Sequence, residues 1–199
     1  MKSKENDPSI EQLHVFGIHI PRRTIYMGSE DSGPDGESGT DAKMAEKATK
    51  NLFLLSAISD EPITIITNNV GGDVTHGMAL YDAIHECVCY TTIIVLGQAS
   101  SMGSVILQAA DRRLMSPNAI QLLHFGQAYV SGEALTVYKT VKENKRVDQW
   151  MLRMYLKRIT EKHPKYTIPK VNAMLSTDTY LTAKESVDMG LADGIWCKV

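Results

Sequence analysis

The sequence predicts an α/β fold built on a mainly parallel sheet. Short runs rich in β-branched residues, such as Ile63–Thr67 and Thr91–Leu96, alternate along the chain with longer segments of helical periodicity. Parallel strands need a crossover between them, and the intervening helical segments supply it. At 199 residues the chain is long enough for one well-packed domain. We expect an N-terminal tail or axial segment over 1–22 and a single domain over 23–199.

The chain before the first strand is predicted to be a mobile tail, over residues 1–14. Arg23–Met27 is typical of a first strand, and Gly28 closes it. The acidic, glycine- and serine-rich segment Ser29–Thr40 indicates an exposed loop. Asp41 then caps a predicted helix that ends near Ser59, because apolar residues recur there at helical spacing.

The remaining elements continue this alternation. A helix is expected to end near Glu86, and another follows Ser101. Short extended pieces are predicted around 113–115 and 120–123. The last two helices are marked by Pro169 in a first turn, by a capping box at Thr182–Glu185, and by Gly190 at the C-terminal end.

One predicted helix is unusually long. Ser131–Lys162 contains no proline and only Gly132 near its start. A helix of about 30 residues rises ~1.5 Å per residue and spans roughly 45 Å, longer than a domain of this size can cover. A protruding helix with an apolar stripe needs a partner surface, so we expect oligomerisation. A helix bent back onto its own domain is the alternative.

The composition excludes several classes of protein. A net charge of -2 gives no reason to expect nucleic acid as a partner. The chain has three cysteines, Cys87, Cys89 and Cys197, an odd number that predicts no disulfide framework and favours a reduced, cytoplasmic setting. The narrow spacing of Cys87 and Cys89 disfavours a zinc site. No apolar run approaches about 18 residues, so we expect no membrane span, and the polar N-terminus predicts no secretion signal.

The segment Gly97–Gly103 directly follows the strand at 91–96. Where a strand ends in small residues and a helix follows at once, a serine hydroxyl lies at the helix N-terminus. The helix dipole and the unpaired backbone N–H groups there favour negative charge. Ser101 is therefore the candidate nucleophile. His124 is the candidate base, and Asp178 is the candidate carboxylate that orients it.

Two backbone N–H groups are candidates for the oxyanion hole. Met102 stands at the predicted helix start, and the Gly71-Gly72 pair lets the backbone approach a substrate closely, since neither residue has a Cβ. The N–H groups of Gly72 and Met102 are the predicted donors. The glycine pair lacks both phosphate-binding patterns, G-x-x-x-x-G-K-[ST] and G-x-G-x-x-G.

Each candidate alone also has an ordinary structural explanation. A serine at a helix start is commonly an N-cap, a histidine between apolar residues a core residue, and an aspartate a turn former. The order Ser101, His124, Asp178, with Ala99 two residues before the serine, disfavours an α/β-hydrolase. No metal-ligand pattern involves the other histidines, which are His14, His19, His76, His85 and His163.

Together these segments resemble the proteolytic subunits of the Clp protease, a family of serine peptidases. The match runs from about Arg23 to Ile195. It rests on ordered motifs at Asn68–Gly72, Gly97–Gly103, Ser116–Asn118, Asp178–Ala183 and Gly190–Ile195.

The resemblance implies a crotonase-like fold with a protruding handle helix, here about 131–162. It implies two stacked heptameric rings, a tetradecamer, that enclose a chamber, and a hexameric Clp ATPase that threads unfolded polypeptides into it. Ser101, His124 and Asp178 match the triad, and Gly72 and Met102 match the oxyanion hole. The peptidase itself binds no cofactor in this family, because ATP belongs to the partner.

The sequence departs from the family pattern in four places. Val70 stands where the family has proline, and Phe125-Gly126 stands where it has Gln-Pro after the histidine. The loop Ser29–Thr40 is longer than usual, and the N-terminal segment matches poorly where the family forms axial pore loops.

Three other functions are compatible with parts of the pattern. A non-catalytic or ATPase-activated ring subunit of a mixed Clp complex shares the family, although such subunits commonly lack a triad residue. A crotonase-type acyl-CoA enzyme shares the fold by analogy only. A membrane-associated serine–lysine peptidase is disfavoured by His124 and by the lack of an apolar segment.

Overall fold

The computed structural model describes residues 8–28, 39–126 and 130–197. The helices are α1 (Pro8–Phe16), α2 (Ala42–Ile58), α3 (Val74–His85), α4 (Met102–Leu107), α5 (Ala134–Lys162), α6 (Ile168–Leu175) and α7 (Ala183–Met189), with a 3-10 turn at Ile20–Arg22. The strands are β1 (Ile18–His19), β2 (Thr24–Met27), β3 (Ile63–Asn69), β4 (Thr91–Ser100), β5 (Arg112–Met115), β6 (Ile120–Leu123), β7 (Thr179–Thr182) and β8 (Gly194–Ile195).

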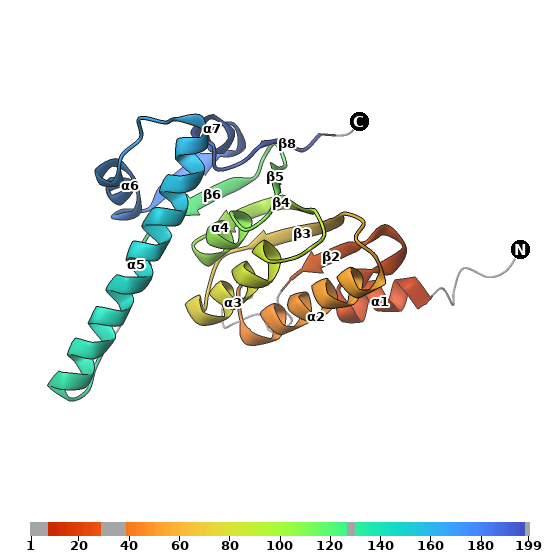
Figure 1. Ribbon diagram of the computed structural model, residues 1–199, viewed down its shortest axis with the longest axis horizontal. Coiled ribbons are helices and arrows are strands. Elements are labelled where there is room, and N and C mark those ends of the chain that lie inside the picture. Colours follow the sequence, from red (N-terminus) through yellow and green to blue (C-terminus); the bar gives the residue numbers. More distant parts are fainter. Residues whose placement is uncertain (1–7, 29–38, 127–129, 198–199) are drawn as a thin grey trace, which may run out of the picture.

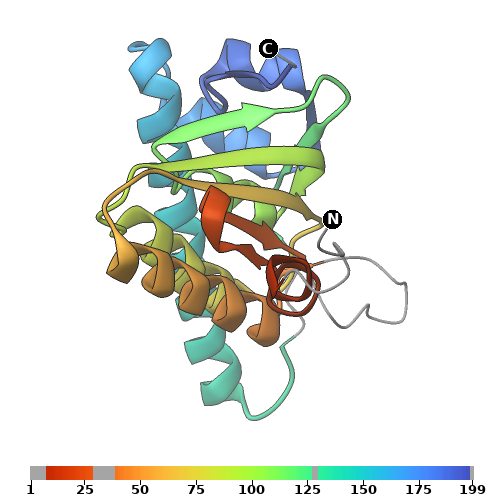
Figure 2. The same ribbon diagram turned by 90° about the vertical axis from the view of Figure 1, so that its right-hand side faces the viewer.

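The strands form one mixed sheet in which parallel pairs dominate. Strands β2, β3, β4, β5 and β8 follow one another in parallel, and β1 and β7 add the antiparallel pairs. Figure 2 shows β2 and α1 toward one side of the molecule and the C-terminal elements toward the other. The predicted α/β class with a mainly parallel sheet is confirmed.

Strand β4 is longer than predicted and serves two partners. Its first part, Thr92–Val95, pairs with β5, and its last part, Gln98–Ser100, pairs with β6. Gly97 lies between the two parts with a φ of 82°, a value that favours glycine. The strand therefore carries the chain to Ser101 itself, with no loop before α4.

The core lies between the sheet and helices α2, α3 and α4, which Figure 1 shows side by side. Alternate residues of β3, such as Ile63 and Ile65, are fully buried, as are Leu55 of α2 and Leu80 of α3. Burying each such side chain contributes about 1.5–3 kcal/mol relative to leaving it in water. This packing holds the end of β4 and the start of α4 in place.

The prediction of a mobile tail over 1–14 is wrong from residue 8 onward, where α1 forms; residues 1–7 lie outside the described part. Side chains of α2 bind the last carbonyls of this helix: Lys47 Nζ donates to Val15 O at 2.8 Å and Asn51 Nδ2 donates to Phe16 O at 2.7 Å. Strand β1 then pairs with β2. These partners lie far along the chain, so no local pattern indicates them.

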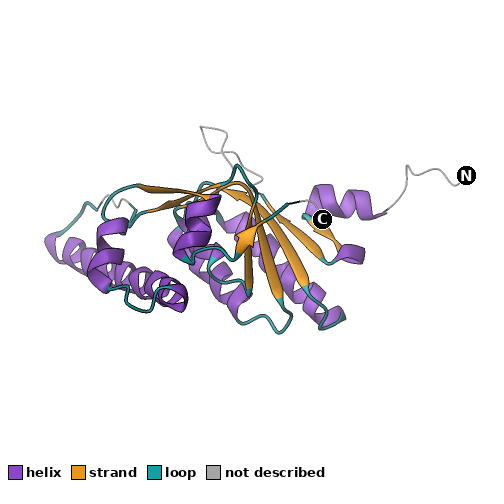
Figure 3. Ribbon diagram, turned by 90° about the horizontal axis from the view of Figure 1, so that it is seen from above, coloured by secondary structure: helices purple, strands orange, loops and turns teal. Residues whose placement is uncertain are grey.

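The predicted long helix is confirmed as α5, with 29 residues. Its buried residues all lie in its second half, at Met151, Leu152, Met154, Tyr155 and Ile159. Figures 1 and 3 show its first half extending beyond the sheet, so the helix is not bent back onto the domain. Leu135 and Tyr138 on this half are 64% and 66% exposed.

Both predicted helix caps are confirmed. The carboxylate of Asp41 accepts a hydrogen bond from Met44 N at 2.7 Å, and Thr182 and Glu185 form the capping box of α7. Gly190 ends that helix with a φ of 84°. The predicted loop Ser29–Thr40 lies largely outside the described residues. None of the described helices combines the length and apolar character needed to cross a membrane.

Candidate active site

Two strand ends bring the candidate nucleophile beside the candidate base. Strands β4 and β6 run parallel, with Ser100 opposite Leu122. Beyond this pair the N–H of Ser101 donates to Leu122 O at 2.9 Å, while the other strand continues to His124. Residues that are 23 positions apart in the sequence thus leave the sheet at the same edge.

The register of β6 and β7 brings the candidate base to its carboxylate. The strands are antiparallel and Leu123 lies opposite Thr179, so one further step sets His124 opposite Asp178. The distance from His124 Nδ1 to Asp178 Oδ1 is 3.2 Å. A backbone hydrogen bond of 2.8 Å from Phe125 N to Leu175 O fixes the chain just after the histidine.

The hydrogen bond between serine and histidine is not formed. His124 Nε2 is buried and has no hydrogen-bond partner among the described residues, so Ser101 Oγ does not reach it. The base and its carboxylate are therefore paired, while the nucleophile stands apart. Serine triads in free enzymes are commonly loose and tighten when substrate binds.

The backbone of Ser101 is strained. Its φ of 52° and ψ of -122° are rare for a residue with a Cβ, and strain of this kind clusters at functional sites. Its side chain makes no capping hydrogen bond to α4. The ordinary explanation of this serine as an N-cap is therefore not supported.

The glycine pair packs directly against the nucleophile. Gly71 and Gly72 have φ values of 98° and 139°. A Cβ on Gly71 would lie 2.5 Å from the Cβ of Ser101, and a Cβ on Gly72 would lie 2.3 Å from Thr40 O. Within the described ranges, the N–H groups of Gly72 and Met102 donate no hydrogen bond. Both donors are free to bind a developing oxyanion.

Two polar residues that the sequence analysis did not single out hold this glycine loop. Thr40 N donates to Gly71 O at 2.6 Å, and Gly71 N donates to the side-chain oxygen of Asn69 at 2.7 Å. Asn69 Nδ2 also donates to Thr40 Oγ1 at 3.0 Å. The asparagine two residues before a glycine is a known turn signal, whereas nothing local marks Thr40.

Helix α4 is also anchored from behind by buried polar side chains. Ser104 Oγ lies 2.9 Å from the hydroxyl of Tyr155 on α5, and Gln121 Nε2 of β6 donates to Ser104 Oγ at 2.8 Å. These contacts fix α4 to the strand that leads to His124 and to the long helix. The angle at which α4 leaves Ser101 is thereby set.

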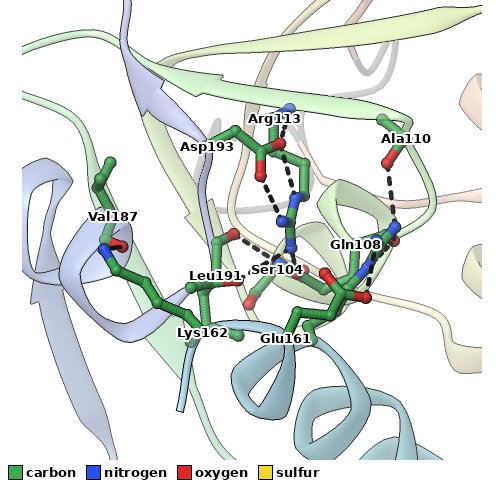
Figure 4. Close-up of polar contacts among 11 residues, drawn as sticks. Ser104, Gln108, Ala110, Arg113, Glu161, Lys162, Val187, Leu191 and Asp193 are labelled. Atoms are coloured by element: carbon green, nitrogen blue, oxygen red, sulfur yellow. Dashed lines mark hydrogen bonds and ion pairs between the residues drawn. The ribbon is translucent and has the colours of Figure 1, made fainter. Parts of the chain in front are cut away.

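A second polar cluster binds the C-terminal end of α4 (Figure 4). Arg113 Nη1 donates to Gln108 Oε1 at 2.8 Å, and its Nε donates to Asp193 Oδ2 at 3.0 Å. Arg158 of α5 donates to the carbonyls of Gln108 and Ala110. Burial acts to raise the pKa of Asp193, but the hydrogen bonds and charge of Arg113 outweigh it and hold the pKa below its ordinary value.

A cavity of about 440 Å³ lies between the start of α3, the chain after His124 and the middle of α5. Its walls include Val74, Phe125 and Met151. In the described part of the chain, no three His, Cys, Asp or Glu side chains gather as a metal site would require.

Comparison with known proteins identifies the family of the chain. A family model described as Clp protease matches residues 36–198, which include every element from α2 to β8. The chain belongs to the Clp protease family. The resemblance inferred from the sequence motifs is thus confirmed, together with the fold that it implies.

Three curated members of the Clp protease family illustrate the similarity. The ATP-dependent Clp protease proteolytic subunit 2 of Pseudomonas aeruginosa is 31% identical over 159 residues, which cover 79% of this chain and 77% of the relative. Subunit 1 of Leifsonia xyli subsp. xyli is 31% identical over 92% of this chain and 88% of its own. The chloroplastic subunit 3 of Arabidopsis thaliana is 27% identical over 94% of this chain, which spans only 57% of that relative.

Proposed function

We propose that this Clp protease family member is a serine endopeptidase that cuts unfolded polypeptides into short peptides. The observation that carries the proposal is the convergence of three strand ends, with the strained Ser101 next to the end of β6 and the His124–Asp178 contact of 3.2 Å. The free N–H groups of Gly72 and Met102 support it. Such an arrangement suits acyl transfer through a serine.

In the proposed mechanism, Ser101 Oγ attacks the carbonyl carbon of the substrate while His124 Nε2 takes its proton. Asp178 accepts the hydrogen bond from Nδ1–H, which fixes the tautomer and stabilises the imidazolium. The N–H groups of Gly72 and Met102 bind the oxyanion. His124 then donates the proton to the leaving amine, and water hydrolyses the acyl-enzyme by the same steps.

We also propose that the subunit works inside a closed chamber of two heptameric rings in the cytoplasm, fed by a hexameric Clp ATPase. The exposed first half of α5 supports a ring contact, because Leu135 and Tyr138 would otherwise stand in water. The three similar proteins are all named as proteolytic subunits of an ATP-dependent protease, which supports an ATPase partner.

The first test is native mass spectrometry of the purified protein after treatment with a fluorophosphonate. We expect one adduct per subunit on a particle of roughly fourteen subunits, the size of two stacked heptameric rings with closed point-group symmetry. The Ser101→Ala variant is the control and should carry no adduct. A small unlabelled species would contradict both the activity and the assembly.

The unpaired Nε2 of His124 favours one second candidate, a ring subunit that is inactive until a partner binds. An unlabelled particle of full size would support it. Adding the Clp ATPase then separates the two forms of this alternative. If Ser101 becomes labelled once the ATPase is present, the protein is an ATPase-activated peptidase. If it stays unlabelled, the protein is a non-catalytic subunit.

A further inference from the structure

The cavity of about 440 Å³ is lined by residues that follow the candidate site residues closely in the sequence. Val74 and Thr75 follow the oxyanion glycines with only Asp73 between, and Phe125 and Gly126 follow His124 directly. The third wall is the middle of α5. A side chain on the residue whose carbonyl is attacked by Ser101 would enter here, because the nearest walls flank both catalytic segments.

The lining combines apolar side chains with polar ones, among them three charged side chains from α5. Val74, Phe125, Val147 and Met151 supply apolar surface, and the charged residues are Glu143, Arg146 and Asp148. The cavity of about 440 Å³ thus suits a side chain with a long alkyl portion. The charged residues of the lining determine which chemical group is favoured at the end of that substrate side chain.

Two of the three charges satisfy each other. Arg146 Nε donates to both carboxylate oxygens of Glu143, at 2.9 and 3.0 Å, across one turn of α5. Both side chains are well exposed to solvent, at 65% and 58%. This pair leaves no net charge to direct toward a ligand.

The third charge has no such partner. Asp148 is half-buried, and within the described ranges its carboxylate makes no hydrogen bond and no ion pair. Burial raises the pKa of its carboxyl, because partial removal from water disfavours the charged form. A half-buried carboxylate without a partner is stabilised by a cation that brings its own hydrogen-bond donors.

We propose that Asp148 is a specificity-determining residue and that this cavity takes a lysine or arginine side chain on the acyl side of the cleaved bond. The inference rests on the proposed peptidase function and deepens it. The alkyl stem packs on Phe125 and Met151, and the cationic end meets the carboxylate. An apolar side chain of equal length fits the same space but leaves the carboxylate unpaired.

The test compares two fluorogenic peptides that differ only in lysine or norleucine before the cleaved bond, since norleucine keeps the alkyl chain and lacks the ammonium group. We expect kcat/KM to be about tenfold higher or more for lysine. Asp148→Asn should remove this preference by lowering kcat/KM for the lysine peptide, and Asp148→Glu should restore most of it. Asp82→Asn, on the exposed side of α3, is the matched control and should keep the wild-type ratio.

A binding measurement distinguishes a failure of this inference from a failure of the proposed peptidase function. In a Ser101→Ala background, fluorescence anisotropy measures the affinity of each labelled peptide without cleavage. We expect the lysine peptide to bind about tenfold tighter, and Asp148→Asn to abolish the difference. Equal affinities, or no measurable binding of the lysine peptide, would overturn the inference even if the wild-type protein cleaves both. Selective binding without any cleavage by the wild type would overturn the proposed function alone.

Discussion

At the scale of single residues, the backbone of Ser101 stores free energy. A φ of 52° with a ψ of -122° brings its Cβ close to its own backbone, which costs on the order of 1–3 kcal/mol. Glycine has no Cβ and adopts this conformation without strain. We therefore expect Ser101→Gly to raise the free energy of unfolding by about 1 kcal/mol, measured by urea denaturation.

Ser101→Ala is the matched control for this prediction. Alanine keeps the Cβ and so keeps the strain, while it removes the same hydroxyl. Both variants should lose peptidase activity, but only the glycine variant should gain stability. Equal stability of the two variants would show that the backbone at this position carries no strain.

Two glycines with the same backbone angle separate steric fit from conformational strain. Gly72 and Gly132 both have a φ of 139°, but a Cβ on Gly72 would lie 2.3 Å from Thr40 O, whereas a Cβ on Gly132 meets open space. Gly72→Ala should displace the oxyanion loop and lower kcat/KM by about 100-fold or more. Gly132→Ala should cost about 1–2 kcal/mol of stability and leave peptide cleavage unchanged. Similar activity losses in the two variants would contradict the steric argument.

The sequence is sufficient to select the candidate site residues but not to predict which hydrogen bonds they make. Ser101 and His124 can be selected by residue type, spacing and family motif. The unpaired Nε2 of the histidine cannot, because it depends on where two separate strand ends lie relative to each other. The role of Thr40 is hidden for the same reason, since it contacts a loop 29 residues further along the chain.

At the scale of elements, α4 owes its position to hydrogen bonds from neighbours as well as to packing. The hydroxyl of Tyr155 lies 2.9 Å from Ser104 Oγ in a fully buried setting. Burial raises the pKa of Tyr155, so the hydroxyl stays protonated. Tyr155→Phe should therefore cost about 1–2 kcal/mol of unfolding free energy, measured by chemical denaturation.

Tyr138→Phe is the control for that experiment. It removes the same hydroxyl from the same helix, but Tyr138 is 66% exposed and its hydroxyl stays solvated in the native state. No measurable change in stability is expected. If the two variants lose equal stability, the contact with Ser104 contributes nothing to holding α4.

Elements with a strong local pattern could be predicted, and elements that depend on distant partners could not. The β-branched run that begins β4 was sufficient to identify this strand, but its extension through Gly97–Ser100 was not visible. That segment contains no β-branched residue, and pairing with β6 holds it extended. Strands β7 and β8 have four and two residues, and unlike the similarly short β5 and β6 they bury no residue, so they lack an alternating buried face.

At the scale of the whole molecule, one ion pair, between a buried arginine and a partly exposed aspartate, joins β5 to the chain between α7 and β8. The side chain of Arg113 is 4% exposed, and its Nη2 lies 2.5 Å from Asp193 Oδ1. The pKa of Asp193 in the native state lies below its ordinary value of 3.8. The stabilisation is therefore complete above this value and is lost as the pH falls through the native pKa.

Asp193→Asn tests this linkage. At pH 7 the variant leaves the arginine buried without a charged partner and should lose about 3 kcal/mol of unfolding free energy. Denaturant titrations at several pH values should show the gap to wild type shrinking below about pH 4, where the Asp193 carboxylate of the unfolded wild-type chain begins to take up a proton. A gap that stays constant down to pH 2 would contradict a lowered pKa at this residue.

The placement of α5 between His124 and Asp178 along the chain has a consequence for synthesis. The ribosome makes the nucleophile and the base first, then the 29 residues of the long helix, and only afterwards the strand that begins beside Asp178. Until β7 emerges and pairs with β6, the imidazole has no carboxylate to orient it. For a peptidase of the proposed kind, the nascent chain is therefore inactive for several seconds of translation. A chain truncated within α5 lacks Asp178 and β7 and does not become an active peptidase.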